Sequence, residues 1–290
     1  MTRTFSIRKR TEVYRRSAMS GHEAGCPICA GTSTESLAVP RRLDLVRCRA
    51  CGHRYLRVGA PSQVEVIYND HYAGFRDDPV FERVAARLVA TELVARVPPP
   101  ARLLDVGCGN GAFLSLARNA GYVGVGIDIS DAAGELCRRQ GLDTRIGDLR
   151  STSVIGSDER FALITFWDVV EHLPDPASFL TRAYDLLVPG GIVIVKTPRT
   201  STASVAVSAR IPRVAGALLQ TPSHIQFFRE DDLRSLLRRA GFSSVDFLPL
   251  GSMRSVATGG SLRRRLARRV LRTYQRLAGD GNLLAIARRD

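Results

Sequence analysis

Residues 103–113 read Leu-Leu-Asp-Val-Gly-Cys-Gly-Asn-Gly-Ala-Phe, and this stretch decides the expected fold. The apolar run from Leu103 to Val106 is typical of a buried strand, and the three glycines at alternate positions after it indicate a tight turn. A helical pattern begins at Ala112. Because glycine has no Cβ, the turn can adopt positive φ and lie close to a ligand. The stretch predicts a strand, a glycine turn whose free N–H groups favour negative charge, and a helix N-terminus.

A carboxylate just before the turn, on Asp105, can meet a cation. An anion-favouring turn beside a carboxylate suits a zwitterionic amino-acid group better than a pyrophosphate. The order D-x-G-x-G-x-G, formed by Asp105, Gly107, Gly109 and Gly111, resembles motif I of the class I S-adenosylmethionine (SAM)-dependent methyltransferases and differs from the dinucleotide-binding G-x-G-x-x-G. The resemblance implies that these four residues and Cys108 bind SAM.

Strand and helix signals alternate after residue 101, which predicts an α/β fold with a doubly wound parallel sheet. The expected strands cover residues 103–106, 122–128, 142–146, 161–167 and 192–196, with helices over 111–120, 131–140, 175–187 and 229–240. Two late strands, 244–250 and 282–287, match the antiparallel hairpin that the resemblance implies. We therefore expect a Rossmann-like, seven-stranded SAM-binding domain over residues 101–290.

Four of the six cysteines form two C-x2-C knuckles, Cys26/Cys29 and Cys48/Cys51. This spacing predicts a four-cysteine zinc ribbon over residues 21–60, in which Zn²⁺ replaces the hydrophobic core that so short a segment cannot build. Sulfur fills all four positions, so the site is expected to be structural. Free thiols or redox use are the alternatives.

Residues 61–100 are expected to link the ribbon to the SAM domain and to end in a helix over 79–97. The resemblance implies that Tyr72, or else Tyr68, covers the methionyl end of SAM. Simple packing between the two domains is the alternative role for these tyrosines.

Two carboxylates at later strand ends complete the expected SAM pocket. Asp128, which is followed by Ile129, lies 17 residues after Gly111 and offers two acceptor oxygens to two ribose hydroxyls. Asp148 and Leu149 resemble the methyltransferase position that reaches the adenine amino group. An acid after a strand is also common at ordinary turns.

The stretch 166–176, Phe-Trp-Asp-Val-Val-Glu-His-Leu-Pro-Asp-Pro, looks like the loop after strand four in small-molecule O-methyltransferases such as those of ubiquinone biosynthesis. Trp167 is expected to line the SAM pocket. Asp168, Glu171 and His172 are able to deprotonate a hydroxyl or to bind a divalent ion. Two routes stay open: His172 as general base, or Glu171 and His172 holding a metal that acidifies the acceptor. The alternative is that both residues only shape the loop and cap the next helix.

A second base candidate, His224, lies in the segment 200–228, which we expect to cover the site. Residues 200–220 of this segment are expected to be helical, and residues 221–228, which include His224, form a polar-aromatic stretch before the next helix. Similar methyltransferases bring a histidine from this position toward the acceptor pocket. A role in loop packing is the alternative.

Composition limits where the protein acts and what it can bind. The chain has 290 residues and is 44% hydrophobic, yet no apolar run approaches the roughly 18 residues of a spanning helix, so we expect no transmembrane segment and a cytoplasmic protein. The net charge is +14, and almost all of the positive charge is arginine. It is concentrated in two places: Arg3 to Arg16, within a leader of residues 1–20, and Arg254 to Arg276, where a basic helix is expected over residues 261–277. Such patches can attract nucleic acid or anionic lipid, or they can be solvated faces without a partner.

The sequence therefore predicts an enzyme that transfers a methyl group from SAM to oxygen, with carbon or nitrogen as alternatives, of a small-molecule acceptor. A specialised metabolite, a sugar or a quinone-like compound fits, with the zinc ribbon framing the acceptor pocket. An rRNA or tRNA methyltransferase that uses its basic surface, a peripheral contact with anionic membrane and a non-enzymatic zinc-ribbon adaptor are the competing hypotheses.

Overall fold

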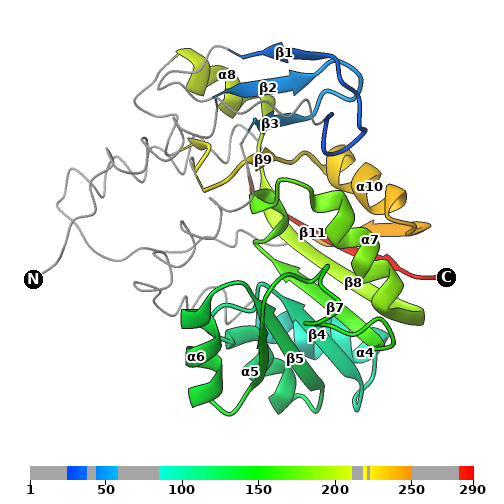
Figure 1. The fold of residues 1–290 in the computed structure, drawn as a ribbon. Helices are drawn as coiled ribbons and strands as arrows, with labels where there is room; N and C mark the ends of the chain where they lie inside the picture. Colours follow the sequence, from blue (N-terminus) through cyan, green and yellow to red (C-terminus); the bar gives the residue numbers. More distant parts are fainter. Residues whose placement is uncertain (1–24, 38–43, 58–84, 211–217, 221–222, 250–280) are drawn as a thin grey trace, which may run out of the picture.

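The computed structural model describes residues 25–37, 44–57, 85–210, 218–220, 223–249 and 281–290 (Figure 1). Three predictions lie outside these ranges and remain predictions: the basic leader, the covering role of Tyr68 or Tyr72, and the basic helix over residues 261–277.

The larger sheet has seven strands in the order β10-β11-β8-β7-β4-β5-β6. Neighbouring strands from β8 to β6 run parallel, while β11 is antiparallel to both β8 and β10. The predicted doubly wound sheet with a terminal antiparallel hairpin is confirmed. Its strands are β4 (Arg102–Val106), β5 (Val123–Asp128), β6 (Asp143–Ile146), β7 (Phe161–Trp167), β8 (Leu187–Arg199), β10 (Ser244–Phe247) and β11 (Gly281–Arg288).

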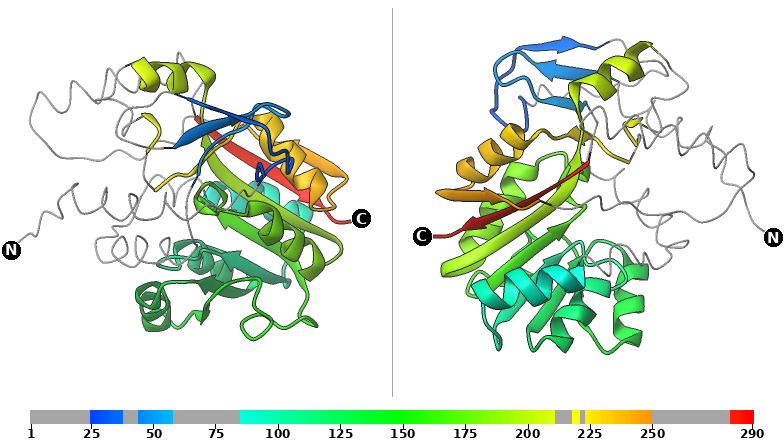
Figure 2. Two further views of the ribbon diagram at one scale, coloured as in Figure 1. Left: turned by 45° about the horizontal axis from the view of Figure 1, so that its top comes forward. Right: turned by 180° about the vertical axis from the view of Figure 1, so that it is seen from behind.

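Helices cover both faces of this sheet, because alternate strand residues point to opposite sides. On one face, Leu104, Ile164 and Val193 pack with α7 (Pro176–Leu186) and α10 (Glu230–Arg239). On the other face, Leu103, Leu163 and Ile192 pack with α5 (Ala112–Asn119) and with Cys137 of α6 (Asp131–Arg139). They also pack with the lead-in helix, which is the helix expected over residues 79–97 and described from residue 85. The lead-in helix comes to the front when the molecule is seen from behind (Figure 2, right).

Two predicted elements differ from the observed ones in extent. The described part of the lead-in helix contains a π-helical turn, η1 (Val89–Leu93), before α4 (Val94–Arg96) ends it. Strand β8 is 13 residues long, much longer than predicted. At its start Leu187 pairs with Phe161 of β7, and beyond its predicted end β11 pairs with it as far as Arg199.

A second, four-stranded sheet has the order β1-β2-β3-β9. Its first three strands, β1 (Thr34–Ser36), β2 (Leu45–Cys48) and β3 (Arg54–Leu56), come from the expected ribbon. The fourth strand, β9 (Gln226–Phe227), comes from the polar-aromatic stretch at the end of the expected cover segment, residues 200–228. The helix expected at the start of that segment is present as α8 (Thr202–Arg210), whereas β9, for which the sequence predicts no strand, pairs with β3.

The ribbon also shares an apolar core with the expected cover segment, residues 200–228. Leu45 and Leu56 of the ribbon pack against Val205, Leu219, Ile225 and Phe227. The ribbon, β9 and α10 lie together at one end of the molecule (Figure 1). Among the described residues, no helix is long and apolar enough to cross a membrane.

Candidate functional site

The glycine turn after β4 has the backbone that the sequence predicts. Gly107, Gly109 and Gly111 have φ of 70°, 55° and 79°, in the left-handed region that favours glycine. A Cβ on Gly107 would lie 2.5 Å from Cγ2 of Val169, so this glycine also lets the loop after β7 approach the turn. The carboxyl ends of β4 and β7 therefore meet at one site.

The N–H groups of this turn are not free, which corrects the prediction that they would face an anion. Gly107 and Cys108 donate to the carbonyl of Ile127 at 2.7 and 3.1 Å, and Gly111 donates to the carbonyl of Cys108 at 2.9 Å. Gly109 donates to Oδ2 of Asp128 at 3.0 Å. The turn is thus fixed onto β5, and the glycines serve shape and close approach.

Asp128 ends β5 with both carboxylate oxygens anchored. Oδ2 accepts from the backbone of Gly109 and Oδ1 accepts from the backbone of Ser130 at 2.9 Å. Ser130 also caps α6, and half-buried Ile129 lies between the two. A carboxylate oxygen accepts more than one hydrogen bond, so this fixed carboxylate suits a diol such as the ribose of SAM.

Asp105 lies under the turn, 2% exposed, and accepts a hydrogen bond from Oγ1 of Thr165 at 2.7 Å. Burial raises the pKa of Asp105 to about 8, although the Thr165 hydrogen bond opposes the shift. A cationic amino group nearby would favour the ionised carboxylate.

The loop after β6 carries Asp148 and the fully buried Leu149. The carboxylate of Asp148 is held by Arg150, whose Nη2 donates to Oδ2 at 2.6 Å and whose backbone N–H donates to Oδ1 at 2.8 Å. Burial opposes ionisation, but these hydrogen bonds lower the pKa of Asp148. Asp148 is therefore ionised and half-buried at the edge of the expected adenine site.

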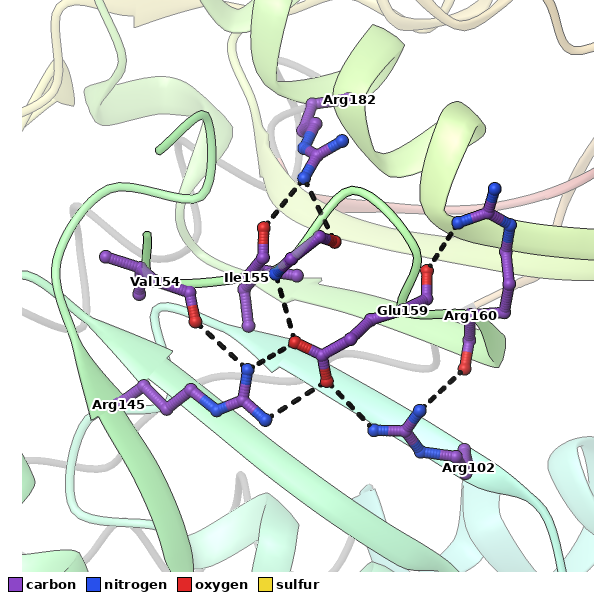
Figure 3. A network of polar contacts seen from close by, with 8 residues as sticks. Arg102, Arg145, Val154, Ile155, Glu159, Arg160 and Arg182 are labelled. Atoms are coloured by element: carbon purple, nitrogen blue, oxygen red, sulfur yellow. Dashed lines mark hydrogen bonds and ion pairs between the residues drawn. The ribbon is translucent and has the colours of Figure 1, made fainter. Parts of the chain in front are cut away.

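A network of arginines fixes the far end of the same loop (Figure 3). Glu159 accepts from Nη2 of Arg145 at 3.1 Å and from Nη2 of Arg102 at 3.0 Å. Arg182 of α7 donates to the carbonyl of Ile155 at 2.8 Å. The segment that follows Asp148 is thereby tied to β4, β6 and α7.

The loop after β7 brings two acidic side chains, Asp168 and the buried Glu171, against the end of β8. Glu171, 1% exposed, accepts from Oγ1 of Thr197 at 2.8 Å through Oε2, and its Oε1 has no hydrogen-bond partner within the described ranges. Burial, aided by the charge of Asp168, raises the pKa of Glu171 well above its ordinary value. Lys196 of β8 forms an ion pair with both carboxylate oxygens of Asp168. Asp168 has φ of 53°, an uncommon conformation for a residue other than glycine.

Two of these residues, Lys196 and Thr197, were missed by sequence reasoning. The signal was present, because a lysine at the carboxyl end of a buried strand interrupts an apolar run.

The N-cap of α7 is Asp175, whose Oδ1 accepts from the backbone of Ser178 at 3.2 Å. Glu171 and His172 face other partners, which disfavours a capping role for them.

His172 and His224, far apart in sequence, lie together with ring centroids 4.8 Å apart in an edge-to-face arrangement. Nδ1 of His172 lies 2.7 Å from the carbonyl of Ser223 and Nε2 lies 3.9 Å from Oε1 of Glu171. Burial and the neighbouring His172 lower the pKa of His224 to about 3, so that ring is neutral near pH 7. One ligand atom from each of Glu171, His172 and His224 lies within 4.8 Å of the others.

The four knuckle cysteines converge as the spacing predicts. Sγ of Cys26 lies 3.6 Å from Sγ of Cys51, and Sγ of Cys29 lies 3.5 Å from Sγ of Cys48. Tetrahedral Zn–S bonds of about 2.3 Å require S–S separations of about 3.8 Å, so the geometry fits zinc. Burial raises the pKa of the Cys26 thiol to about 11, and a bound cation would offset that cost.

Comparison with known proteins decides the family. A family model described as a methyltransferase domain matches residues 73–246, more than half of the chain. The chain belongs to the class I SAM-dependent methyltransferase family. This methyltransferase is 30% identical over 178 residues to a ubiquinone biosynthesis O-methyltransferase of Cereibacter sphaeroides, a match that covers 59% of the chain and 72% of the relative.

A second relative of that name, from Ruegeria pomeroyi, is 32% identical over 151 residues, which cover half of the methyltransferase and 61% of the relative's length. Among solved structures, a SAM-dependent methyltransferase from Archaeoglobus fulgidus aligns with a TM-score of 0.51 and 22% identity, over 77% of this chain and 99% of that one. The cyclase SpnF aligns with a TM-score of 0.53 and 22% identity, over 78% and 96%. These likenesses show the fold alone, and the cyclase illustrates that one fold supports different reactions.

Proposed function

We propose that this methyltransferase transfers the methyl group of SAM to a hydroxyl oxygen of a small-molecule acceptor. The observation that carries the proposal is the group formed by the buried Glu171 and the partly buried His172 and His224, on the side of the glycine turn where the loop after β7 reaches Gly107. Asp105, the glycine turn, Asp128 and Asp148 supply the SAM side. Methyl transfer to carbon or nitrogen is the alternative.

The protein's main task in this reaction is orientation, because SAM already carries a good leaving group. The acceptor oxygen must lie in line with the methyl–sulfur bond and away from water. Phe113 and Trp167, with ring centroids 4.9 Å apart, form an apolar wall next to the turn.

Proton removal from the acceptor falls to His172. The carbonyl of Ser223 can only accept, so Nδ1 of His172 carries the proton and Nε2 is the basic nitrogen of the neutral ring. The imidazolium formed would face the Glu171 carboxyl at 3.9 Å. His224, with a pKa of about 3, is a weak base and more suitable as a neutral hydrogen-bonding wall.

A divalent ion at the same group is the competing route to an ionised acceptor. Its support is the unpartnered, buried Oε1 of Glu171 beside two imidazoles. An ion held by Glu171, His172 and His224 would acidify the hydroxyl. Chelation that leaves the ribbon zinc in place separates the routes: unchanged turnover supports His172 alone, and loss of turnover restored by Mg²⁺ or Mn²⁺ supports the ion.

A quinone-like or other hydroxylated aromatic is the acceptor class we favour, because the relatives are O-methyltransferases named for ubiquinone biosynthesis. A sugar or another specialised metabolite remains an alternative acceptor. The ribbon would hold Zn²⁺ in a structural role. The basic segments behind the nucleic-acid and membrane hypotheses lie outside the described residues.

The direct test is mass spectrometry with methyl-deuterated SAM. Substituted catechols with and without an alkyl chain, a panel of deoxysugar nucleotides, and bulk tRNA and rRNA are offered to the zinc-loaded protein. We expect one labelled methyl group on a catechol oxygen. Labelled RNA bases, or SAM binding without transfer to any offered small molecule, would contradict the proposal.

A further inference from the structure

One buried side chain, Gln226, joins the second cysteine knuckle to the loop that carries Glu171 and His172. Gln226 is 3% exposed and lies on β9, opposite Tyr55 of β3. Its Nε2 donates to the carbonyl of Leu173 at 3.0 Å, and its Oε1 lies 2.9 Å from Nε2 of His53. The amide therefore contacts both the ribbon and the expected acceptor loop.

The direction of these hydrogen bonds is fixed by chemistry. A backbone carbonyl can only accept, so the amide nitrogen must face Leu173 and the amide oxygen must face the ring. His53 consequently donates through Nε2. Reversing the amide would break both bonds at a site with almost no exposure to water, which is costly.

His53 is itself fixed to the knuckle. It follows Cys51 by two residues, and its carbonyl accepts from the backbone of Cys48 at 2.8 Å. The ring is fully buried, stacked on Tyr55 and 3.3 Å from Oδ2 of Asp232. The ring position therefore depends on the fold of the Cys48–Cys51 turn.

Arg229 provides a second tie between the knuckle and the body. Its Nη2 donates to the carbonyl of Cys51 at 3.0 Å and to Oδ1 of Asp232 at 2.6 Å, at the start of α10. The knuckle thus contacts both β9 and α10 through directional bonds.

On the side away from the ribbon, residues 223–226 form a hydrogen bond with each of the three loop residues Glu171, His172 and Leu173. Ile225 donates to the carbonyl of Glu171 at 2.9 Å, and His172 donates to Ser223. With the Gln226 bond to Leu173, three consecutive loop residues are registered against this one segment.

We propose that Gln226 is a positioning residue for methyl transfer. It aligns the Glu171–Leu173 loop with the Cys48–Cys51 knuckle, so that the metal-bound fold of this knuckle sets the orientation of the His172 ring. The proposal rests on the proposed function only for the role of His172. A ribbon that merely packs against the body would stabilise the fold without setting that ring.

The test compares Gln226→Leu with Thr202→Val in the full-length, zinc-loaded protein. The first removes both bonds of the amide at similar volume. The second removes another hydrogen bond between ribbon and body, from Nη2 of Arg54 to Oγ1 of Thr202 at 3.1 Å, on α8 and away from the loop. Zinc content and SAM affinity are expected to stay unchanged in both.

The deciding measurement is the side-chain ¹H–¹⁵N spectrum of the histidines. The chain has five, so each signal can be assigned by substitution. We expect His172 to show a single Nδ1–H tautomer in the wild type and in Thr202→Val, and an averaged tautomer in Gln226→Leu. With an accepted catechol, kcat should fall roughly 10- to 100-fold in Gln226→Leu, with KM for SAM unchanged.

An unchanged His172 signal in Gln226→Leu, even with a lower Tm, would overturn the proposal, because a packing role predicts only lost stability. If that variant does not fold, replacing Zn²⁺ by the larger Cd²⁺ in the wild type gives the same decision: the His172 signal must move while SAM affinity holds. Since neither spectrum needs an acceptor, failure of the proposed reaction and failure of the positioning role are distinguished.

Discussion

The proposed SAM side and the proposed acceptor side of the site are built in different ways. The SAM side comes from consecutive strand ends: the turn after β4 is bonded to Ile127 and Asp128 of the neighbouring strand β5. The acceptor side takes Glu171 and His172 from one loop, Lys196 from a strand, His224 from a distant segment and its support from the ribbon. A cofactor shared by a family can be bound by one local motif, whereas an acceptor pocket is assembled by tertiary contacts.

The largest expected effect comes from disrupting the ribbon, which should impair the acceptor side much more than the SAM side. Cys48→Ser removes one of the four proposed zinc ligands, so we expect bound zinc to be lost and the Cys48–Cys51 turn to unfold. Turnover should fall when the knuckle unfolds. SAM affinity should fall much less, because no hydrogen bond between described residues joins the ribbon to the glycine turn. Elemental analysis and calorimetry measure the two quantities.

Arg49→Ala, at a neighbouring side chain that is 62% exposed, is the matched control and should keep its zinc. Full zinc content in Cys48→Ser would show that the ribbon does not use this sulfur.

His172→Ala tests the acceptor side alone. Loss of a general base typically costs about 10²- to 10⁴-fold, and we expect about 1,000-fold in kcat with unchanged SAM affinity. His224→Ala should cost less, because a ring with a pKa of about 3 takes up protons poorly. Equal and small losses in both variants would exclude His172 as the base.

Asp128→Ala tests the SAM side alone. It removes a carboxylate that fixes the backbones of Gly109 and Ser130, and it should weaken SAM binding about 100-fold, equivalent to roughly 2.7 kcal/mol. Asp131→Ala, at an exposed position in the first turn of α6, should leave the calorimetric Kd unchanged. A similar Kd for both variants would rule out the ribose contact.

The last effect, on stability rather than on binding or turnover, concerns pH and Asp105. Its pKa rises from 3.8 in the unfolded chain to about 8 when buried, so the unfolded state binds fewer protons between these values and SAM-free stability falls as pH rises through that window. Asp105→Asn should lack this loss, with a Tm that exceeds the wild type by several degrees at pH 8, since each kcal/mol moves Tm by about 2–4 °C.

Bound SAM should raise the Tm of the wild type at pH 8 and so narrow its difference from Asp105→Asn, because the amino group of SAM favours the ionised carboxylate of Asp105. Parallel Tm curves for the two proteins between pH 5 and pH 8 would contradict this role.

The strands and the glycine turn of the proposed SAM side were predictable from sequence because their signals are local, while the binding roles of its residues stay predictions. Strand ends, glycines and carboxylates follow one another within a few residues, and each of the seven strands overlaps its predicted range, although β8 extends well beyond it. The expectation that the N–H groups of the turn would be free was wrong, because they donate to the carbonyl of Ile127 and the carboxylate of Asp128 on the neighbouring strand. That pairing depends on the register of β4 against β5.

The acceptor side was predictable only as separate candidates. His172 and His224 were each singled out, but nothing in the sequence indicated that their rings touch. Gln226 was missed because its partners, Leu173 and His53, are 53 and 173 residues away. The pairing of β9 with β3 creates both contacts, and a two-residue strand gives no periodic signal.

The core shared by the ribbon and the cover segment has a consequence for shortened forms of the chain. Ile225 and Phe227 are each 2% exposed, and Leu45, Leu56 and the edge of β3 are what cover them. A chain that starts after residue 60 would present these apolar side chains and the open edge of β9 to solvent. Exposed strand edges beside apolar surface promote self-association. Trimming the ribbon to obtain a minimal catalytic domain should therefore yield aggregates.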